Sequence, residues 1–234
     1  MSSCFGLFGL ILEYFYQFVN GTQSIVVNGK RYNIIKQLGE GGFGFVMLVK
    51  EPNVYGEPKA LKRIRIQLAE HESRARNEIA AHQAVDSDHV LKLLDSDFIS
   101  SNGCLTDALL LLPFFPNGTV QDWIDRLMLD EFIPLNDILK LSMGIIKGLE
   151  AFHSLQPPLA FRDLKPANIL IGSNSEAVLM DLGSVTEARV SLRSRKDALT
   201  LYDFCAETVT APYRSPELYD PPSIGDVDES SDIW

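Results

Sequence analysis

FRDLKPAN, at residues 161–168, is the most informative sequence in this chain. It presents a carboxylate, Asp163, and a carboxamide, Asn168, and the apolar run that follows predicts a short strand. A turn then leads into a second predicted strand, residues 177–180, which delivers Asp181. Two such strands bring Asn168 and Asp181 close together. A carboxylate that orients and deprotonates a hydroxyl, with a carboxamide and a second carboxylate that hold Mg²⁺, is the set that phosphoryl transfer from ATP requires.

These motifs resemble the catalytic elements of eukaryotic protein kinases. Residues 162–168 correspond to the catalytic loop and residues 181–183 to the metal-binding triplet. The resemblance implies an α+β, bilobal protein-kinase-like fold, with a β-rich small lobe and a mainly helical large lobe. It also implies ATP as the nucleotide, with Mg²⁺ (or Mn²⁺) held by Asn168 and Asp181. An isolated Arg-Asp-x-Lys would be weak evidence, but the ordered set of motifs is specific.

The sequence GEGGFGFV, at residues 39–46, contains the G-x-G-x-x-G pattern. The pattern also occurs in dinucleotide-binding folds, where the loop opens a helix. Here an apolar run continues as a predicted strand, so we expect the loop to be a hairpin tip. Gly39, Gly41 and Gly44 would then let backbone amides approach the ATP phosphates without side-chain clashes.

Lys62 follows in a predicted strand at residues 59–64, which also carries Ala60, an expected neighbour of the nucleotide. The resemblance makes Lys62 the candidate to bind the α- and β-phosphates. A helix predicted over residues 67–85 carries Glu78, the expected ion-pair partner of Lys62. Two earlier glutamates lie in the polar first part of this helix, beside arginines that pair with them.

The adenine site follows from the same resemblance. We expect Val46 to pack on the adenine face, Leu170 to form the floor beneath it, and Phe115 in the hinge to offer backbone groups. Pro113 lacks an amide donor, so a hinge amide bond must come from a later position. Phe43, at the loop tip, either caps the phosphates or is a solvent-exposed aromatic.

Around the catalytic loop, Asp163 is the candidate base and Lys165 the candidate contact to the transferred phosphate, with a solvated lysine as the alternative. Phe161 stands where most kinases have His, and Leu182 replaces the usual Phe. Neither exchange removes a catalytic group. In kinases, the Asp that corresponds to Asp232 bonds the backbone of the catalytic loop.

The activation segment is expected at residues 181–217. Its candidate phosphosites are not ranked by the sequence: Ser184, Thr186, Ser191, Ser194, Thr200 and Thr208. Arg162 could receive such a phosphate. The basic cluster at residues 193–196 is interpreted as a solvated surface, and Thr210 lies where kinases place a Thr that bonds the catalytic Asp and Lys.

Residues 39–43, 110–115 with 118–119, and 178–184 are similar to the numb-associated kinase family, and the likeness covers about residues 25–234. It implies Ser/Thr phosphorylation of proteins, autophosphorylation and a cytoplasmic enzyme on internal, Golgi-type membranes. The likeness is greatest to a member that carries myristoyl and palmitoyl groups. Ser2 excludes N-myristoylation here and leaves acylation at Cys4 open.

The composition sets limits on partners. The chain has 234 residues, and a formal net charge of −10 argues against a broad nucleic-acid surface. We expect protein substrates and no nucleic acid. The three cysteines are scattered, which fits a reducing compartment. No segment reaches the roughly 18 apolar residues of a membrane span. Residues 4–19 are mostly apolar, and are expected either to pack on the small lobe or stay loose, or to contact a membrane surface.

We expect an apolar extension at 1–23, the small lobe at 24–112, the hinge at 113–117 and a partial large lobe at 118–234. The sequence stops where kinases begin the buried central helix of that lobe, so the lobe is expected to be incomplete. The favoured hypothesis is an active Ser/Thr protein kinase. The alternative is a truncated, non-catalytic nucleotide- or partner-binding form. A Rossmann-type fold rests on the glycine loop alone.

Overall fold

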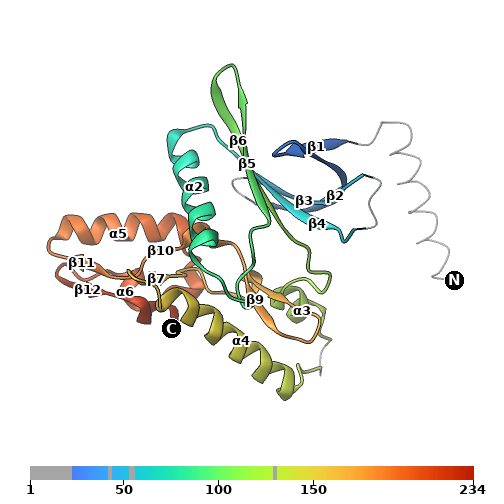
Figure 1. Cartoon of the computed structure of the whole chain (residues 1–234). Helices are drawn as coiled ribbons and strands as arrows, with labels where there is room; N and C mark the ends of the chain where they lie inside the picture. Colours follow the sequence, from blue (N-terminus) through green and yellow to red (C-terminus); the bar gives the residue numbers. More distant parts are fainter. Residues whose placement is uncertain (1–22, 42–43, 53–55, 129–130) are drawn as a thin grey trace. The chain divides into compact units, whose positions relative to one another are not determined.

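The computed structural model of the chain describes residues 23–41, 44–52, 56–128 and 131–234 (Figure 1). The chain divides into two compact units, the first made of Met1–Arg65 and Asp95–Phe114, the second of Ile66–Leu94 and Phe115–Trp234. The expected extension at 1–23, with Cys4, and the tip residue Phe43 lie outside the described residues, apart from position 23. The predicted lobe and hinge boundaries stay a prediction.

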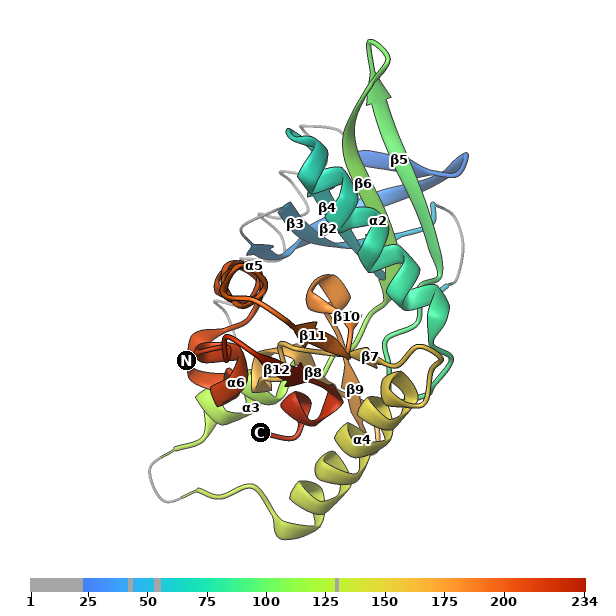
Figure 2. The ribbon, with the colours of Figure 1, turned by 90° about the vertical axis from the view of Figure 1, so that its left-hand side faces the viewer.

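The first unit is a β-sheet whose strands are β1 (Ser24–Val27), β2 (Lys30–Gly41), β3 (Gly44–Lys50), β4 (Lys59–Arg65), β5 (Asp95–Ser101) and β6 (Cys104–Pro113). Their order in the sheet is β1-β2-β3-β4-β6-β5, with antiparallel neighbours throughout. The Asn28-Gly29 sequence predicts a hairpin turn between β1 and β2, and the structure confirms it, because both residues have a positive φ. Figure 2 shows β5 and β6 running side by side into their own hairpin.

The glycine loop connects β2 to β3. Gly41 pairs with Gly44 across the loop, and β3 continues directly as a strand. The expected hairpin tip is therefore confirmed. A Rossmann-type fold, which needs a helix directly after the loop, is excluded.

Alternation along the strands gives the sheet two different faces. One face carries the core of the unit, which is built from Val27, Tyr32, Val49, Leu61, Leu109 and Leu111. The opposite face carries the residues that alternate with these core residues along each strand. They include Val46 and Lys62, which are paired neighbours on β3 and β4.

The second unit contains the helices α2 (Ala69–Ala84), α3 (Val120–Arg126), α4 (Leu135–His153), α5 (Arg195–Thr208) and α6 (Pro216–Tyr219). Its strands are β7 (Leu159–Ala160), β8 (Ile169–Ile171), β9 (Ala177–Leu179), β10 (Thr186–Glu187), β11 (Val190–Leu192) and β12 (Gly225–Val227). Short 3₁₀ turns lie between them, among them η1 (Pro166–Asn168), η2 (Leu182–Ser184) and η4 (Glu229–Asp232).

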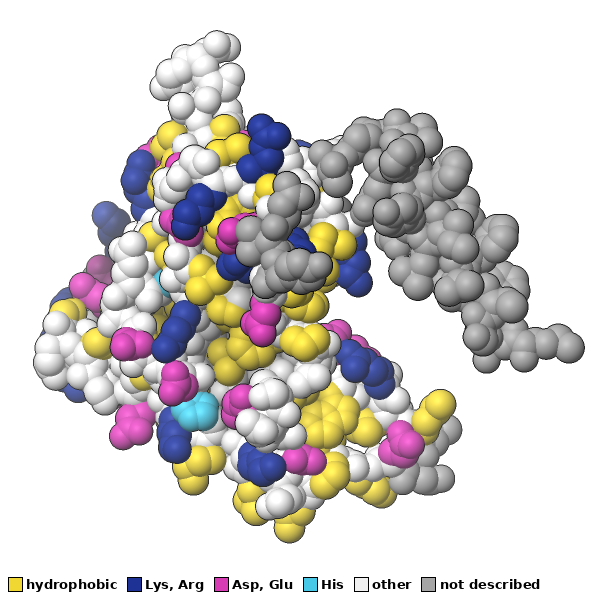
Figure 3. Space-filling view, turned by 45° about the vertical axis from the view of Figure 1, so that its right-hand side comes forward, with side chains coloured by type: hydrophobic (Ala, Val, Ile, Leu, Met, Phe, Trp, Pro, Cys, Tyr) yellow, Lys and Arg dark blue, Asp and Glu magenta, His cyan; other side chains and the backbone are white. Residues whose placement is uncertain are grey.

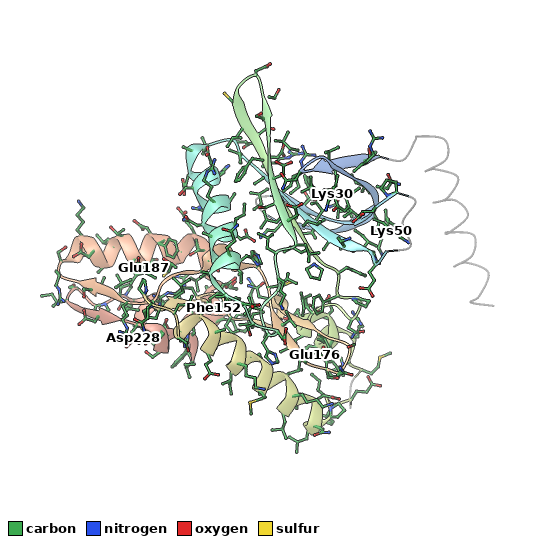
Figure 4. The ribbon with its side chains drawn as sticks, viewed as in Figure 1. Lys30, Lys50, Phe152, Glu176, Glu187 and Asp228 are labelled. Atoms are coloured by element: carbon green, nitrogen blue, oxygen red, sulfur yellow. The ribbon has the colours of Figure 1, made fainter. Side chains whose placement is uncertain are left out.

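Helix α4 packs closely on β9 because glycines line the contact. A Cβ on Gly148 would lie 2.7 Å from the Leu179 side chain and 2.9 Å from the carbonyl oxygen of His89, and Gly144 faces the backbone of Ala177 in the same way. The core around this contact includes Phe152 of α4, labelled in Figure 4, and Phe161, whose ring centroids lie 5.9 Å apart. This packing fixes the strand that leads to Asp181.

The apolar pattern of residues 90–98 predicts one strand, and the first half of this prediction is wrong. β5 begins at Asp95, and Val90 forms an isolated parallel bridge with Leu179 of β9. Leu91 donates its amide to the Leu179 carbonyl at 2.9 Å. The apolar residues after α2 therefore join β9 in the second unit, while the polar residues that follow join the sheet of the first.

Helix α5 lies in the expected activation segment, for which the sequence analysis predicts no helix. Ser194 caps its first turn, because its hydroxyl oxygen accepts from the amide of Asp197, and the same hydroxyl donates to Asp197 Oδ2 at 2.9 Å. Its buried face, with Leu201 and Cys205, packs on Leu192, Val209, Leu218 and Val227. Among the described residues, no helix is long and apolar enough to cross a membrane.

Candidate active site

Asp163 is buried in the second unit, and its carboxylate accepts hydrogen bonds from two residues of the catalytic loop and from Thr210. Its Oδ1 accepts a hydrogen bond from the backbone amide of Thr210 at 2.8 Å. Its Oδ2 accepts from Lys165 Nζ at 2.7 Å and from Asn168 Nδ2 at 3.0 Å. Each carboxylate oxygen can accept more than one bond, so Asp163 keeps capacity to accept a hydroxyl proton.

Lys165 joins the same cluster. Besides its contact to Asp163, its ammonium donates to Thr210 Oγ1 at 2.6 Å. The expected role of Thr210, bonding both the Asp and the Lys of the catalytic loop, is confirmed by these contacts. An ammonium has three donors, and two are used here, so a third can reach a phosphate oxygen.

Asn168 and Asp181 are brought together by the pairing of β8 with β9. Ile169 pairs with Leu179, and the amide of Met180 donates to the Asn168 carbonyl at 2.9 Å. Asn168 and the residue before Asp181 therefore lie at one end of this hairpin, as the sequence predicted. Asp181 has a left-handed backbone, with φ 61° and ψ 71°, and its side chain is exposed.

The donor set fits a divalent metal that also binds phosphates. The Asn168 amide nitrogen is engaged with Asp163, at both its backbone and side-chain oxygens, which leaves Oδ1 as a ligand. Among the described residues, no group of three or more His, Cys, Asp or Glu side chains could hold a metal ion by itself. Mg²⁺ is commonly held by one or two carboxylates together with substrate phosphates, so the oxygen atoms of Asn168 and Asp181 are suitable protein ligands for it.

Asp232 holds the catalytic loop from behind. Its Oδ2 accepts from the amide of Phe161 at 2.7 Å and contacts His153 Nε2 at 2.9 Å. Its Oδ1 accepts from the amide of Arg162 at 2.8 Å. The contact of Asp232 to the loop backbone is confirmed, and His153 supports the same carboxylate. Phe161 keeps the aromatic packing of the position it fills.

Arg162 is buried, and both terminal nitrogens of its guanidinium donate to protein acceptors. Nη1 donates to Ser231 Oγ at 2.6 Å and Nη2 to the Ala188 carbonyl at 2.8 Å. Burial lowers the pKa of the Arg162 guanidinium, and the nearby Asp232 carboxylate opposes that effect. The expected reception of a phosphate by Arg162 is not supported, because the side chain already binds protein acceptors. Glu187 and Asp228, labelled in Figure 4, border this network.

Glu78 is buried on α2, near the metal-binding triplet. A Cβ placed on Gly183 of η2 would lie 3.6 Å from Glu78 Oε2 and 3.7 Å from Asp181 Oδ1. Both carboxylates therefore border Gly183. Lys62 lies in the first unit and Glu78 in the second, and their ion pair stays a prediction.

The predicted nucleotide residues of the first unit share one face of its sheet. Val46 pairs with Gly39 of β2 and with Lys62 of β4, and Ala60 lies two residues from Lys62. Gly44 has a packing reason of its own, because a Cβ there would lie 1.8 Å from the carbonyl oxygen of Arg63. Phe115 and Leu170 lie in the second unit, both half-buried.

The sequence is similar to known protein kinases. Residues 32–234 match the protein kinase domain family. Over 212 residues the chain is 39% identical to serine/threonine-protein kinase 16 of Homo sapiens, covering 90% of this chain and 68% of that protein. A probable serine/threonine-protein kinase of Dictyostelium discoideum is 32% identical, over 89% of this chain and 74% of its own. The serine/threonine-protein kinase ENV7 of Saccharomyces cerevisiae is 26% identical.

Proposed function

Since this chain belongs to the protein kinase family, we propose that it transfers the γ-phosphoryl group of ATP to serine and threonine hydroxyls of proteins, its own included. Membership makes it a protein kinase enzyme that uses ATP and a divalent metal. The expected resemblance of this sequence to the numb-associated kinase family is confirmed as well. The choice of Ser and Thr is supported by the names of the relatives, and Mg²⁺ by the ligands Asn168 and Asp181.

The observation that carries the proposal is the convergence of Lys165, Asn168 and Thr210 on the Asp163 carboxylate. Asp163 accepts the hydroxyl proton of the substrate, while the hydroxyl oxygen bonds to the γ-phosphorus and the bond to the β–γ bridging oxygen breaks. Lys165 donates to the transferred phosphoryl group. Asn168 and Asp181 hold Mg²⁺, which when bound supplies positive charge against the phosphate oxygens.

The nucleotide is assigned to residues of each unit. Lys62 binds the α- and β-phosphates, and Glu78 pairs with it to set its position. The remaining residues proposed to contact ATP are Gly39, Gly41, Gly44, Val46, Ala60, Phe115 and Leu170. The face shared by Val46, Ala60 and Lys62 supports this assignment, as does the alternation of the strands. The lobes and hinge are proposed at the boundaries that the sequence predicted.

The test is phosphate transfer by the purified full chain from γ-labelled ATP, with Mg²⁺, to casein and to itself. Asp163→Asn is expected to lower the rate by at least about 10²-fold, because it removes the proton acceptor. Asp220→Asn, at an exposed carboxylate, is the matched control. Analysis of the labelled amino acids distinguishes serine and threonine from tyrosine. A wild-type chain no more active than Asp163→Asn would contradict the proposal.

The same preparation distinguishes the active kinase from the non-catalytic, nucleotide-binding alternative. A ligand stabilises the state it binds, so Mg-ATP should raise the unfolding midpoint of any form that binds nucleotide. A shift without phosphate transfer would favour the nucleotide-binding form over the enzyme. A shift together with transfer is the expected result.

We also propose that the enzyme works at the cytoplasmic side of internal membranes. The sequence of residues 4–19 supports this, since its apolar side chains and Cys4 are suited to a membrane surface, and these residues lie outside the described part of the structure. Flotation with liposomes compares the palmitoylated chain with Cys4→Ser. Equal flotation of both, or of neither, would overturn acylation as the anchor.

A further inference from the structure

Helices α2 and α5, far apart in the sequence, are joined by an ion pair. Arg74 Nη2 contacts Glu207 Oε2, and the same nitrogen contacts Glu70 Oε1 at 2.5 Å one turn earlier in α2. The Arg74 side chain is 27% exposed, whereas Glu207 is 59% exposed. Arg74 also lies one turn before Glu78 on the same helix.

We propose that Arg74 and Glu207 are positioning residues for phosphoryl transfer. Through this pair α5 holds α2, and α2 in turn holds Glu78 beside Asp181. The inference rests on the proposed kinase function and adds two residues to it, neither of which touches the nucleotide.

The other end of α2 is anchored in a different way. His82 Nδ1 lies 2.8 Å from the Leu91 carbonyl oxygen, and the amide of Leu91 donates to Leu179 of β9. These backbone contacts follow Glu78 in the chain, while the Arg74 contact precedes it. Glu78 therefore lies between two points at which α2 is held.

The first turn of α2 lacks a side-chain cap. Its N-cap residue, Leu68, makes no side-chain capping bond and is 61% exposed. A helix end without a cap frays readily, because its first amides lack partners. A contact from α5 near this end is thus well placed to limit its motion.

The α5 end of the pair lies close to the catalytic carboxylate along the chain. Glu207 is in the last turn of α5, and the amide of Val209 closes that turn on Cys205. The next residue, Thr210, donates to Asp163 and accepts from Lys165. One helix end thus contacts both α2 and the acceptor side of the site.

The test is a double-mutant cycle on the full chain, with Arg74→Gln, Glu207→Gln and both together. Each single change is expected to lower kcat about threefold to tenfold, in the range of coupling energies carried by such contacts. The double variant should be no slower than the slower single, because both changes remove one interaction. Arg74→Lys, which keeps the charge, should restore at least half of the activity.

A matched control exists on the same helix. Arg76 pairs with Glu72 at 2.8 Å, but this pair lies within α2. Arg76→Gln should therefore change kcat less than twofold. The wild-type rate should also fall with added salt more steeply than that of the double variant, because partly exposed pairs are screened.

Additive losses, unchanged rates, or a loss confined to the unfolding midpoint would overturn the inference. An inactive wild type would instead contradict the proposed function. In that case hydrogen exchange of the α2 amides still decides, since Glu207→Gln should speed exchange near Arg74 and Arg76→Gln should not. Equal exchange in the wild type and Glu207→Gln would overturn the role of the pair.

Discussion

The Asp232 carboxylate accepts a 2.8 Å hydrogen bond from the amide of Arg162, a residue whose φ of 69° is left-handed. A non-glycine residue in this region is strained by about 1–2 kcal/mol, and persists where its surroundings fix it. Asp232 also accepts from Phe161 and contacts His153, so one carboxylate fixes the backbone that precedes Asp163.

We therefore predict that Asp232→Asn destabilises the fold. An amide nitrogen would replace one acceptor and face a backbone N–H, at a cost of about 2–4 kcal/mol for a buried, charged acceptor. Urea unfolding followed by circular dichroism measures the loss. Asp220→Asn, at an exposed carboxylate, should leave the midpoint unchanged. Equal midpoints for the two variants would show that Asp232 does not hold the loop.

Gly148 allows α4 to approach β9. Gly148→Ala is expected to destabilise the chain by about 1–3 kcal/mol, because the added methyl collides with Leu179 and with the backbone of His89. The helix propensity gained by Ala, about 1 kcal/mol, opposes this loss. Ser142→Ala, on the exposed side of α4, is the control, and should leave stability equal or higher. A stabilised Gly148→Ala would mean that the helix moves away without cost.

How far the sequence predicts this structure depends on how local the signal is. Asp163, Lys165 and Asn168 lie within six positions, and their cluster follows from one motif. Helix α5 was missed because its exposed face is also apolar, with Leu199, Tyr202 and Phe204, which blurs the helical period. The capping pattern of Ser194 and Asp197 was the signal that could have found it.

The prediction of where β5 begins is wrong for another reason. Residues 90–94 are rich in Val and Leu, as a buried strand would be, but Val90 bridges to Leu179 and the Leu91 amide donates to Leu179, so this run meets β9 in the second unit. Tertiary packing decides which strand an apolar run joins, and the hydrophobic periodicity of the sequence alone does not identify that partner. The pairing of Arg74 with Glu207 was likewise invisible, since the two residues are 133 positions apart.

Figure 3 shows hydrophobic side chains on the surface at the height of α3 and α4, between charged ones. The exposed apolar residues of α4 are Leu135, Ile138, Leu139, Met143 and Ile146. Apolar residues recur at helical spacing along this segment, which predicts a helix with one apolar stripe, but only part of that stripe is buried. Periodicity identified the helix, and it did not show which side of the stripe would be covered.

The glycines of the loop can be separated by experiment. Gly44→Ala should destabilise the first unit, because its Cβ would lie 1.8 Å from the Arg63 carbonyl oxygen across β3 and β4. Gly39→Ala meets nothing within 4 Å, so the fold should tolerate it. We expect Gly39→Ala to raise KM for ATP severalfold with an unchanged unfolding midpoint. If Gly39→Ala instead unfolds the chain, the fold itself requires the conformational freedom of glycine at position 39, and ATP binding is not the reason for it.

Asp107 gives a prediction for pH. Arg63 binds it through two bonds, at 2.7 and 3.0 Å, and these bonds lower the pKa of the Asp107 carboxyl. A depressed pKa contributes stability above the unfolded value of about 3.9, and this stability is lost as pH falls through the folded value.

Asp107→Asn should therefore cost about 1–3 kcal/mol at pH 7, the range for a hydrogen bond to a charged group. The difference from the wild type should shrink as pH falls below about 4. Urea unfolding at several pH values measures it. Asp86→Asn is the control, because that carboxylate is 96% exposed and lies 3.6 Å from Lys92. A difference that does not depend on pH would assign the effect of Asp107→Asn to packing.

Thr210 tests the active site without removing a charged group. Its hydroxyl accepts from Lys165 at 2.6 Å, while its amide donates to Asp163, a contact that any side chain retains. Thr210→Val keeps the shape and the amide but leaves one Lys165 donor without an acceptor. We expect kcat to fall about tenfold, as the ammonium loses its second anchor, with little change in KM for ATP. Thr210→Ser restores the hydroxyl and should recover most of kcat. Steady-state phosphate transfer by both variants decides, since equal rates for Val and Ser would show that the hydroxyl does not position Lys165.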